Sequence, residues 1–333
     1  MLRISCGMNG FGRFGLHHLS YYLERIEESN FDLKFINDDI LSIDDAYDII
    51  QNDRYVKIHE KFDIKIEDDF FIFNNAHRIQ FTNTKSNEIP WIGSPDIFLE
   101  CSGQFTDANL AREFIVDNTK KVLISATSLN ADKTLVYGFN HDQYSSNNDV
   151  ISYGSCTVNA YVALTSCIDD LFSVNSSDVN VIHNVPEYQL MNGFIGTPGL
   201  PEVPIKRKSC TLAKVAPTLL KCVTDYNFNV NYTLIPYTGV SIIDYRYNLE
   251  SDFSEKFWDL LYFECNEGRL KGLYEIQEKD MGPEKYQNTT YSSVIIKENS
   301  FIRGKDVFLH AYFDNENSVN RFFDLTKYIA TQL

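Results

Sequence analysis

The sequence predicts an α/β chain with two domains. In the first half, short apolar strands alternate with amphipathic helices, which is typical of a doubly wound parallel sheet. In the second half, strand-like segments follow one another with few helices between them. This predicts an α+β domain with a mixed or mostly antiparallel sheet. At 333 residues the chain is long enough to bury two cores.

Composition narrows the functional classes. The net charge of −16 argues against a nucleic-acid-binding face, which needs clustered Lys and Arg. No apolar run approaches the ~18 residues that span a bilayer, and the N-terminal sequence lacks the pattern of a signal peptide. The seven cysteines are an odd number without metal-ligand spacing. We therefore expect a cytoplasmic protein with no metal site, no nucleic-acid partner and no membrane partner.

The first strand leads into a glycine-rich turn. Apolar and polar residues alternate over residues 2–6, and Gly10, Gly12 and Gly15 follow. In a Rossmann-type turn the first glycine permits the tight bend, the second lets a pyrophosphate approach the backbone, and the third lets helix pack on strand. Apolar residues at helical spacing begin at Leu16. The pattern predicts a dinucleotide site.

A carboxylate follows the second strand of this unit. The apolar residues 33–36 predict that strand. Asp38 lies 23 residues beyond Gly15, close to the spacing of roughly 20 residues at which a carboxylate binds the adenosine ribose. A carboxylate there repels a 2′-phosphate, which favours NAD over NADP. The alternative interpretation of Asp38, a helix cap or turn residue, is less favoured.

The rest of the first half completes the alternation. Residues 62–66, 71–73 and 79–81 predict short antiparallel strands. A buried strand at 96–103, a helix at about 107–118 and a strand at 121–126 follow. Ser102 and Ser125 lie at carboxyl ends of these strands, as turn residues or cofactor contacts.

Cys156 stands where a strand gives way to a helix. Residues 149–151 predict the strand end, and the apolar residues from Tyr161 to Leu171 have helical spacing. Free backbone N–H groups and the helix dipole at that point would lower the pKa of a thiol and make it a nucleophile. The alternative, a small apolar cysteine at the start of a core helix, is favoured for an isolated cysteine.

The second half carries a histidine strand and a long irregular segment. Residues 178–185 predict a strand that includes His183. Residues 193–204, rich in Gly and Pro, form a segment whose length indicates a function or an interface. Further strands are predicted at 228–236, 240–244, 292–296 and 306–312, and a helix at 319–333.

These motifs together resemble the glyceraldehyde-3-phosphate dehydrogenase family. The matching stretches, in chain order, are Asn9-Gly10-Phe11-Gly12-Arg13 with Gly15, Ile36-Asn37-Asp38, Glu100 to Thr106, Lys120 to Ala126, Ser155-Cys156-Thr157 with Asn159, and Tyr312 to Glu316. The resemblance implies a Rossmann-type NAD domain at 1–155, completed by the C-terminal helix 316–333. It implies a catalytic domain at 156–315.

The resemblance also implies roles for individual residues. Cys156 would attack an aldehyde substrate to give a thiohemiacetal and then a thioester, with His183 as its base. Asn315 would bind the nicotinamide carboxamide, and the Cys156 backbone N–H would donate to the oxyanion. The cofactor contacts would be Asn9, Gly10, Phe11, Gly12, Arg13, Phe14, Asp38, Ser102, Gly103 and Ser125. The glycine- and proline-rich segment resembles one that lines the pocket across a subunit boundary, which implies a homotetramer.

The sequence departs from the family where the family binds phosphate. Pro186 and Tyr188 replace a Thr and an Asp, and Leu234 stands in place of an Arg. If Pro217 aligns with the family's proline, Leu220-Lys221 occupies the place of a Thr-Gly pair. Val158 replaces a Thr. A dianionic phosphate without charge-assisted hydrogen bonds is poorly compensated in a partly dry site.

Three hypotheses remain open from the sequence. The favoured one is an NAD-dependent aldehyde dehydrogenase of this family that acts through Cys156 and His183 on a substrate other than glyceraldehyde 3-phosphate. The others are the ordinary phosphorylating enzyme with a rebuilt anion site and a non-catalytic NAD-binding scaffold. Candidate substrate residues are Ser155, Thr157, Tyr188, Glu187, Lys221 and Tyr237, and the alternative for Lys221 is a surface lysine. Lys206, Arg207 or Lys208 could hold an anion.

Overall fold

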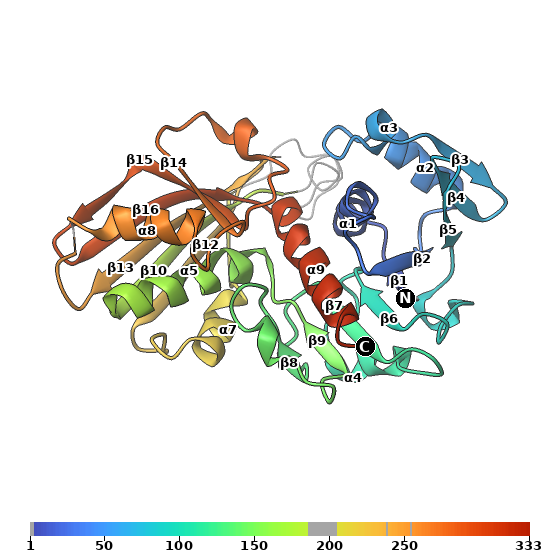
Figure 1. The fold of residues 1–333 in the computed structure, drawn as a ribbon, viewed down its shortest axis with the longest axis horizontal. Coiled ribbons are helices and arrows are strands. Elements are labelled where there is room, and N and C mark those ends of the chain that lie inside the picture. Colours follow the sequence, from blue (N-terminus) through green and yellow to red (C-terminus); the bar gives the residue numbers. More distant parts are fainter. Residues whose placement is uncertain (1–2, 186–204, 238, 254) are drawn as a thin grey trace. The chain divides into compact units, whose positions relative to one another are not determined.

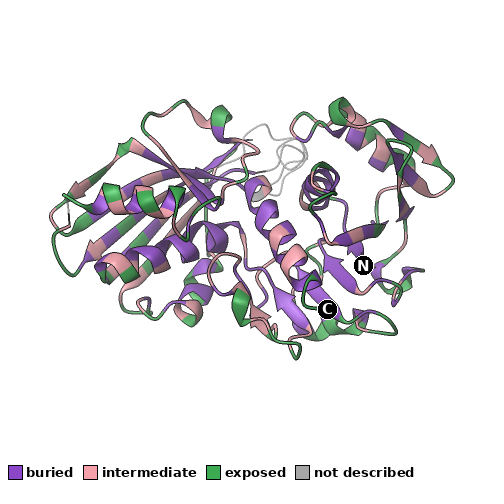
Figure 2. Cartoon of the chain, in the orientation of Figure 1, coloured by how far each residue is buried: buried purple, intermediate pink, exposed green. Residues whose placement is uncertain are grey.

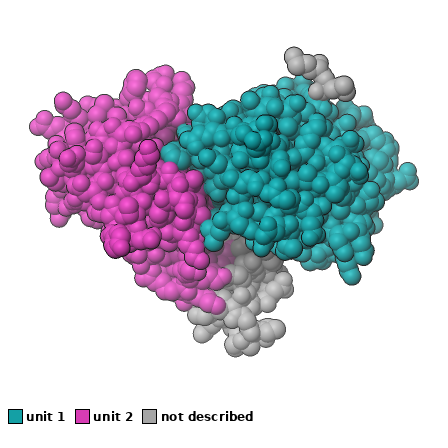
Figure 3. Space-filling view, turned by 90° about the horizontal axis from the view of Figure 1, so that it is seen from below, with its two compact units in different colours: residues 1–154, 319–333 teal, residues 155–318 magenta. Residues whose placement is uncertain are grey.

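The computed structural model describes residues 3–185, 205–237, 239–253 and 255–333. The chain divides into two compact units. Unit 1 is Met1–Gly154 with Val319–Leu333, and unit 2 is Ser155–Ser318 (Figure 3). In the described part of the chain, no helix is both long and apolar enough to cross a membrane.

Unit 1 is built on sheet A, whose strands lie in the order β3-β4-β5-β2-β1-β6-β7-β9-β8 (Figure 1). The central pairings from β5 through β2, β1, β6, β7 and β9 are parallel, whereas β3–β4 and β4–β5 are antiparallel. The strands are β1 (Ile4–Asn9), β2 (Phe31–Asn37), β3 (Ile64–Glu67), β4 (Phe70–Phe73), β5 (His77–Thr82), β6 (Ile97–Glu100), β7 (Lys121–Ile124), β8 (Lys133–Thr134) and β9 (Val150–Ser152). The prediction of a parallel, doubly wound sheet is confirmed.

Alternate residues of the central strands enter two different cores. Leu99 of β6 and Leu123 of β7 belong to a core shared with α1 and α9. Phe98 and Val122, their neighbours in sequence, belong to a second core that includes Phe114. Because strand side chains alternate between faces, both faces of sheet A are buried, as a doubly wound sheet requires (Figure 2).

Unit 1 has the predicted helices and, where the sequence predicted only short strands, two more at Ile43–Asn52 and Ile58–Lys61. The helices of unit 1 are α1 (Arg13–Glu24), α2 (Ile43–Asn52), α3 (Ile58–Lys61), α4 (Ala108–Ala111), the 3-10 turns η1 (Ser86–Glu88), η2 (Arg112–Phe114) and η3 (His141–Gln143), and most of α9 (Asn315–Ala330). The helix expected at 107–118 is shorter. It passes into η2, and Asp117 then adopts a left-handed φ of 49°, which helical geometry does not allow.

Unit 2 is built on sheet B, in the order β11-β12-β10-β13-β16-β15-β14. The pairs β10–β12 and β14–β15 are parallel and the others are antiparallel, which confirms the predicted mostly antiparallel sheet. The strands are β10 (Val174–His183), β11 (Lys206–Lys208), β12 (Phe228–Leu234), β13 (Ser241–Leu249), β14 (Tyr274–Gln277), β15 (Ser293–Arg303) and β16 (Asp306–Phe313). The helices are α5 (Cys156–Phe172), α7 (Leu212–Leu219), α8 (Phe257–Asn266) and the 3-10 turn η4 (Pro283–Tyr286).

Two buried tyrosines fix the first turn of α5 against sheet B. The Tyr245 hydroxyl donates to the Ala160 carbonyl oxygen at 2.8 Å, and the Tyr274 hydroxyl donates to the Asn159 carbonyl oxygen at 2.7 Å. Both rings are almost fully buried. A buried hydroxyl needs such a partner. The start of α5, where Cys156 lies, is therefore held at a defined place over the sheet.

Candidate active site

A thiol and an imidazole meet in unit 2. Cys156 is the first residue of α5, and His183 is the last residue of β10. The Sγ atom of Cys156 lies 3.5 Å from Nε2 of His183, and both side chains are buried. The two candidate catalytic residues, 27 positions apart in sequence, are thus in contact.

The second ring nitrogen defines the tautomer of His183. Nδ1 lies 2.7 Å from the carbonyl oxygen of Asn184, and a carbonyl can only accept a hydrogen bond. Nδ1 therefore carries the proton, and Nε2 presents a lone pair to Cys156. The Asn184 backbone N–H donates to Oγ of Ser241 at 3.0 Å, and that hydroxyl donates to Oδ1 of Asn184 at 2.9 Å. These two hydrogen bonds hold Asn184, whose carbonyl oxygen in turn orients the imidazole.

The thiol does not have the lowered pKa that the helix N-terminus alone predicts. Burial raises the pKa of Cys156 above its ordinary value, and the nearby Cys210 thiol raises it further. The Thr157 backbone N–H lowers it, but by less. Desolvation disfavours the thiolate more strongly than the start of α5 favours it. The expectation of a preformed thiolate is wrong for this arrangement.

Burial also keeps the imidazole neutral. It lowers the pKa of His183, and the hydrogen bond to Asn184 opposes that shift only in part. The ring packs against Tyr232, with ring centroids 5.4 Å apart, and against Phe313 at 5.7 Å. A neutral imidazole with a free lone pair on Nε2 is suited to accept the thiol proton when the sulfur attacks.

Ser155 and Thr157, both predicted substrate residues, lie beside the thiol. Ser155 caps α5, because its Oγ accepts from the Val158 backbone N–H at 3.3 Å. Oγ1 of Thr157 lies 3.1 Å from Oγ of Ser155 and 3.6 Å from Sγ of Cys210. Cys210, just before α7, was missed from the sequence, where no motif marks it.

Of the other predicted substrate residues, only Lys221 and Tyr237 are among the described residues, and neither has a described contact with the thiol. Lys221 is exposed in the turn after the C-terminal end of α7, whereas Cys210, beside Thr157, precedes its N-terminal end. Tyr237 follows β12 and is partly exposed, and its carbonyl oxygen accepts from the Val185 backbone N–H at 3.0 Å. Tyr188, Glu187, Pro186 and the segment 193–204 lie outside the described residues.

The glycine turn in unit 1 fits a dinucleotide. Gly10 has a φ of 98°, and a Cβ there would lie 2.4 Å from the Ser102 backbone nitrogen. A Cβ at Gly15 would lie 2.2 Å from the Gly10 carbonyl oxygen, so strand and helix touch there. A Cβ at Gly12 would meet no described atom within 4 Å, and Gly12 is the residue that precedes α1. The turn thus leaves open space for a pyrophosphate at the N-terminus of α1.

Asp38 is oriented by the same turn. Its Oδ2 accepts from the Phe11 backbone N–H at 2.7 Å, and its Oδ1 accepts from the N–H groups of Ile40 and Leu41, each at 3.0 Å. Oδ2 has a further lone-pair position for a ribose hydroxyl, whereas the two backbone N–H groups occupy both positions of Oδ1. Asp38 therefore combines a turn-residue role with the geometry of a ribose acceptor.

Four predicted cofactor residues use their side chains for contacts within unit 1, namely Asn9, Phe11, Arg13 and Phe14. Asn9 is buried, and its amide donates to Glu100 at 2.9 Å and to Ser86 at 3.2 Å. The rings of Phe11 and Phe14 pack inside unit 1. Arg13 forms an ion pair with Asp53. These side chains support the turn from behind.

Glu100 organises the far side of the turn and was missed from the sequence. Burial raises its pKa, although hydrogen bonds from Ser102 and Asn9 oppose the shift. The Ser102 backbone N–H and hydroxyl both donate to Oε1 of Glu100. Gly103 follows with a φ of 72°, and the Ser125 backbone N–H donates to the Glu100 carbonyl oxygen at 2.9 Å. The sequence did carry a signal for this role, because Glu100 is a charged residue at the end of an apolar, buried strand.

Asn315 begins α9, and nothing is described of its side chain. Its neighbours Asp314 and Glu316 lie within electrostatic reach of Cys156, because their charges raise the pKa of that thiol slightly. The chain around Asn315 thus approaches the thiol within unit 2.

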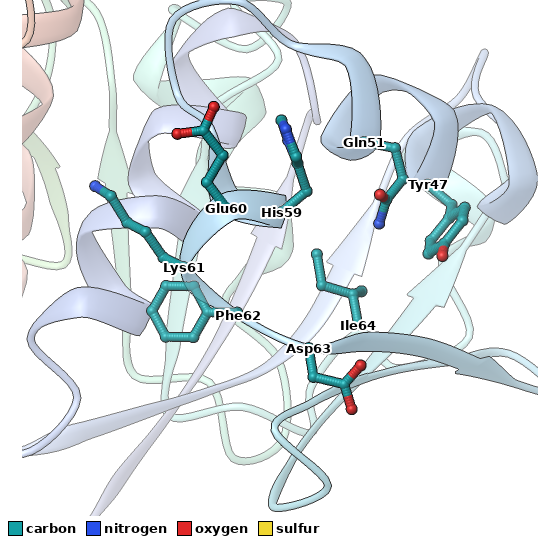
Figure 4. A pocket seen from close by; sticks show the side chains of 8 residues that line it. All are labelled: Tyr47, Gln51, His59, Glu60, Lys61, Phe62, Asp63 and Ile64. Carbon is teal, nitrogen blue, oxygen red and sulfur yellow. The ribbon is translucent and has the colours of Figure 1, made fainter.

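Two further findings concern ligand sites. Among the described residues, no group of three or more His, Cys, Asp or Glu side chains has the arrangement of a metal site. A polar, open cavity of about 480 Å³ lies in unit 1 between α2, α3 and β3 (Figure 4). None of the predicted site residues lines it.

Comparison with known proteins places the chain in a class. The profile "Glyceraldehyde 3-phosphate dehydrogenase, NAD binding domain" matches residues 4–108, the part of unit 1 that holds the glycine turn and Asp38. The protein is therefore an NAD-binding dehydrogenase of the Rossmann type, and NAD is its cofactor.

Full-length relatives define the family. The chain is 30% identical to glyceraldehyde-3-phosphate dehydrogenase 2 of Caenorhabditis briggsae over 353 residues, covering all of both chains. It is 27% identical to the cytosolic enzyme of Pisum sativum, with 99% of both chains covered, and 24% identical to enzyme 1 of Bacillus cereus, with 98% covered. The chain belongs to the glyceraldehyde-3-phosphate dehydrogenase family.

Proposed function

We propose that the protein oxidises an aldehyde with NAD, through a thioester on Cys156, and that its substrate differs from glyceraldehyde 3-phosphate. The observation that carries the proposal is the 3.5 Å contact between Sγ of Cys156 and Nε2 of His183, with Nδ1 held by Asn184. A core cysteine that only filled space would need no oriented base.

The resting pair is neutral, so proton transfer accompanies the attack. Nε2 of His183 takes the thiol proton as the sulfur bonds to the carbonyl carbon, and the imidazolium then protonates the new oxyanion. This gives a neutral thiohemiacetal. His183 next removes the hydroxyl proton. NAD, which the glycine turn and Asp38 would hold, would supply the hydride acceptor for this oxidation. Cys156 is left as a thioester, and Asn184 holds the ring throughout.

A changed substrate is supported by the residue beside the base. Leu234 pairs directly with His183 across β10 and β12 and is 6% exposed. The family carries an arginine at the position we align with Leu234. An aliphatic side chain offers no hydrogen bond to a phosphate, and a buried dianion without partners is costly. Phosphate, water, an amine or a thiol are the candidate acceptors of the acyl group.

Activity with defined aldehydes tests this proposal. Purified protein with NAD would be mixed with phosphorylated and unphosphorylated aldehydes, with and without inorganic phosphate, and NADH followed by absorbance. We expect NADH from an aldehyde other than glyceraldehyde 3-phosphate. Turnover of glyceraldehyde 3-phosphate at a rate typical of the family would favour the phosphorylating enzyme. No NADH, together with no alkylation of Cys156, would favour an NAD-binding scaffold.

We also propose a cytoplasmic homotetramer with the domain division stated above, in which residues 1–155 and 316–333 bind NAD and residues 156–315 carry the catalytic pair. The likeness of the segment 193–204 to a subunit-boundary loop supports the tetramer. Sedimentation equilibrium would measure its mass, and a monomer at working concentration would contradict the assembly.

A further inference from the structure

A short basic strand in unit 2 lies two strands away from the strand that carries His183. Strand β11 consists of Lys206, Arg207 and Lys208, all exposed, at the edge of sheet B. It pairs with β12, which in turn pairs with the β10 strand that carries His183. In a chain of net charge −16, three consecutive cations on one strand are unusual.

The strand register places two of these cations on the face of the catalytic histidine. His183 pairs with Leu234, and Leu234 pairs with Lys206, so these three residues form one row across the sheet. The adjacent row is Val181, Tyr232 and Lys208. Paired residues on neighbouring strands share a face, so Lys206 and Lys208 project on the His183 side.

Side-chain contacts agree with this assignment. The Tyr232 ring packs on the His183 ring, and the pKa of Tyr232 is raised by burial and then by the Cys156 and Cys210 thiols, which places it near both. Arg207, one residue out of phase, instead donates to Oδ1 of Asn231 at 3.3 Å. Arg207 therefore belongs to the opposite face.

We propose that Lys206 and Lys208 form the subsite for an anionic group on the aldehyde substrate, in place of the family's phosphate anchor. This inference rests on the proposed function. The backbone of Lys206 stands two strand spacings from that of His183, about 10 Å across the sheet, and Lys208 lies in the adjacent row. Leu234 and Tyr232 lie between. The site thus fits an aldehyde whose carbonyl is separated by a short uncharged spacer from a carboxylate or phosphate.

The competing explanation is that lysines on an edge strand only prevent pairing with other chains. That role requires charge on the strand but is indifferent to the face. The two explanations are separated by comparing the variant Lys206→Met/Lys208→Met with Arg207→Met, which removes a charge from the same strand on the other face. All three positions are exposed, so both variants are expected to fold.

Paired substrates measure the subsite. The value of kcat/KM would be determined for 4-oxobutanoate against its methyl ester, and for glyceraldehyde 3-phosphate against glyceraldehyde. In the double lysine variant, kcat/KM for the anionic member of the responding pair should fall about tenfold to hundredfold. For the neutral member, kcat/KM should change less than about twofold. A response of the 4-oxobutanoate pair identifies a carboxylate. A response of the glyceraldehyde 3-phosphate pair identifies a rebuilt phosphate site and contradicts the changed substrate. Equal changes for both members, or the same loss in Arg207→Met, would overturn the subsite.

Alkylation of Cys156 gives a readout that does not require turnover. Rate constants for iodoacetate and iodoacetamide would be compared by mass spectrometry, and the ratio should fall several-fold in the double lysine variant but not in Arg207→Met. If NADH forms and Cys156 reacts while this ratio is unchanged, the subsite is refuted and the proposed function stands. If neither NADH nor alkylation is seen, the proposed function fails and the subsite with it.

Discussion

The glycine turn of unit 1 and the thiol–imidazole pair of unit 2 are built in different ways. The turn is local: Gly10 to Gly15 lie within six residues, and their roles follow from backbone space and one positive φ. The pair is long-range: Cys156 starts a helix, His183 ends a strand, and Asn184 and Ser241 orient the ring. The turn is defined by the absence of side chains, whereas the pair is defined by two side chains and their partners.

This difference determines how each site fails when it is altered. In the turn, an added methyl group either collides with backbone or enters open space, so the effect on folding depends on position. In the pair, substitution leaves the fold supported by the tyrosine contacts to α5 and removes a chemical group. Substitutions in the pair should therefore affect rate, and substitutions in the turn should affect folding and cofactor affinity.

The largest effect is expected for Cys156→Ser. A hydroxyl is a much weaker nucleophile than a thiol beside the same base, so NADH formation should fall by about 10³-fold or more. The fold should be kept, because only one atom is exchanged and Nε2 of His183 can accept the hydrogen bond of the smaller, more polar hydroxyl. Cys222→Ser, at a partly exposed cysteine of the same unit, is the control and should keep its activity. Equal residual activity in the two variants would exclude Cys156 as the nucleophile.

His183→Asn should have the next largest effect. The variant has no group that takes the thiol proton, so kcat should fall by about 10²- to 10⁴-fold. In the wild type, kcat/KM should decline only as pH falls below the ordinary histidine range near 6.5, since burial lowers the pKa of His183. The decline should vanish in the variant. If kcat/KM of the variant declined at low pH as in the wild type, the titrating group would be one other than His183.

Two glycine variants separate folding from cofactor affinity in the turn. Gly10→Ala combines a φ of 98° with a Cβ 2.4 Å from the Ser102 nitrogen, and should destabilise the protein by about 1–3 kcal/mol. Gly12→Ala has a φ of −71° and free space, so it should fold normally while its NAD affinity falls about tenfold or more. Urea unfolding and NADH fluorescence titration measure the two effects. Equal stability losses, or wild-type NAD binding by Gly12→Ala, would contradict this assignment.

The sequence predicted the turn better than it predicted the surroundings of the thiol. Glycine spacing and the position of Asp38 are local, and the observed backbone follows them. The direction of the Cys156 pKa shift was wrong, because the helix N-terminus is visible in sequence but the extent of burial is not. Cys210 and Tyr232 reach the site through α7 and β12, and no spacing rule reveals such tertiary neighbours. The face assignment of Lys206 and Lys208 likewise required the strand register.

The smallest effect concerns His18, which lies on α1 just after the turn. Its ring packs among Phe31, Phe322 and Phe323, and neither ring nitrogen has a hydrogen-bond partner among the described residues. Burial, and then the charge of Arg25, lowers the pKa of His18 to about 3. The folded protein therefore keeps this imidazole neutral at pH values where the unfolded chain protonates it.

The sign of the pH effect follows from that difference. Above pH 6.5 both states are neutral and His18 contributes no pH dependence. Below it the unfolded chain binds a proton that the folded protein excludes, so stability falls by about 1.4 kcal/mol per pH unit from this group. His18→Leu should remove this contribution to the pH dependence of stability. At pH 7 the variant should be as stable as the wild type or more stable, because an unpartnered polar ring is lost. Urea midpoints at pH 7 and pH 5 test this, and an equal shift in variant and wild type would show that His18 is already satisfied.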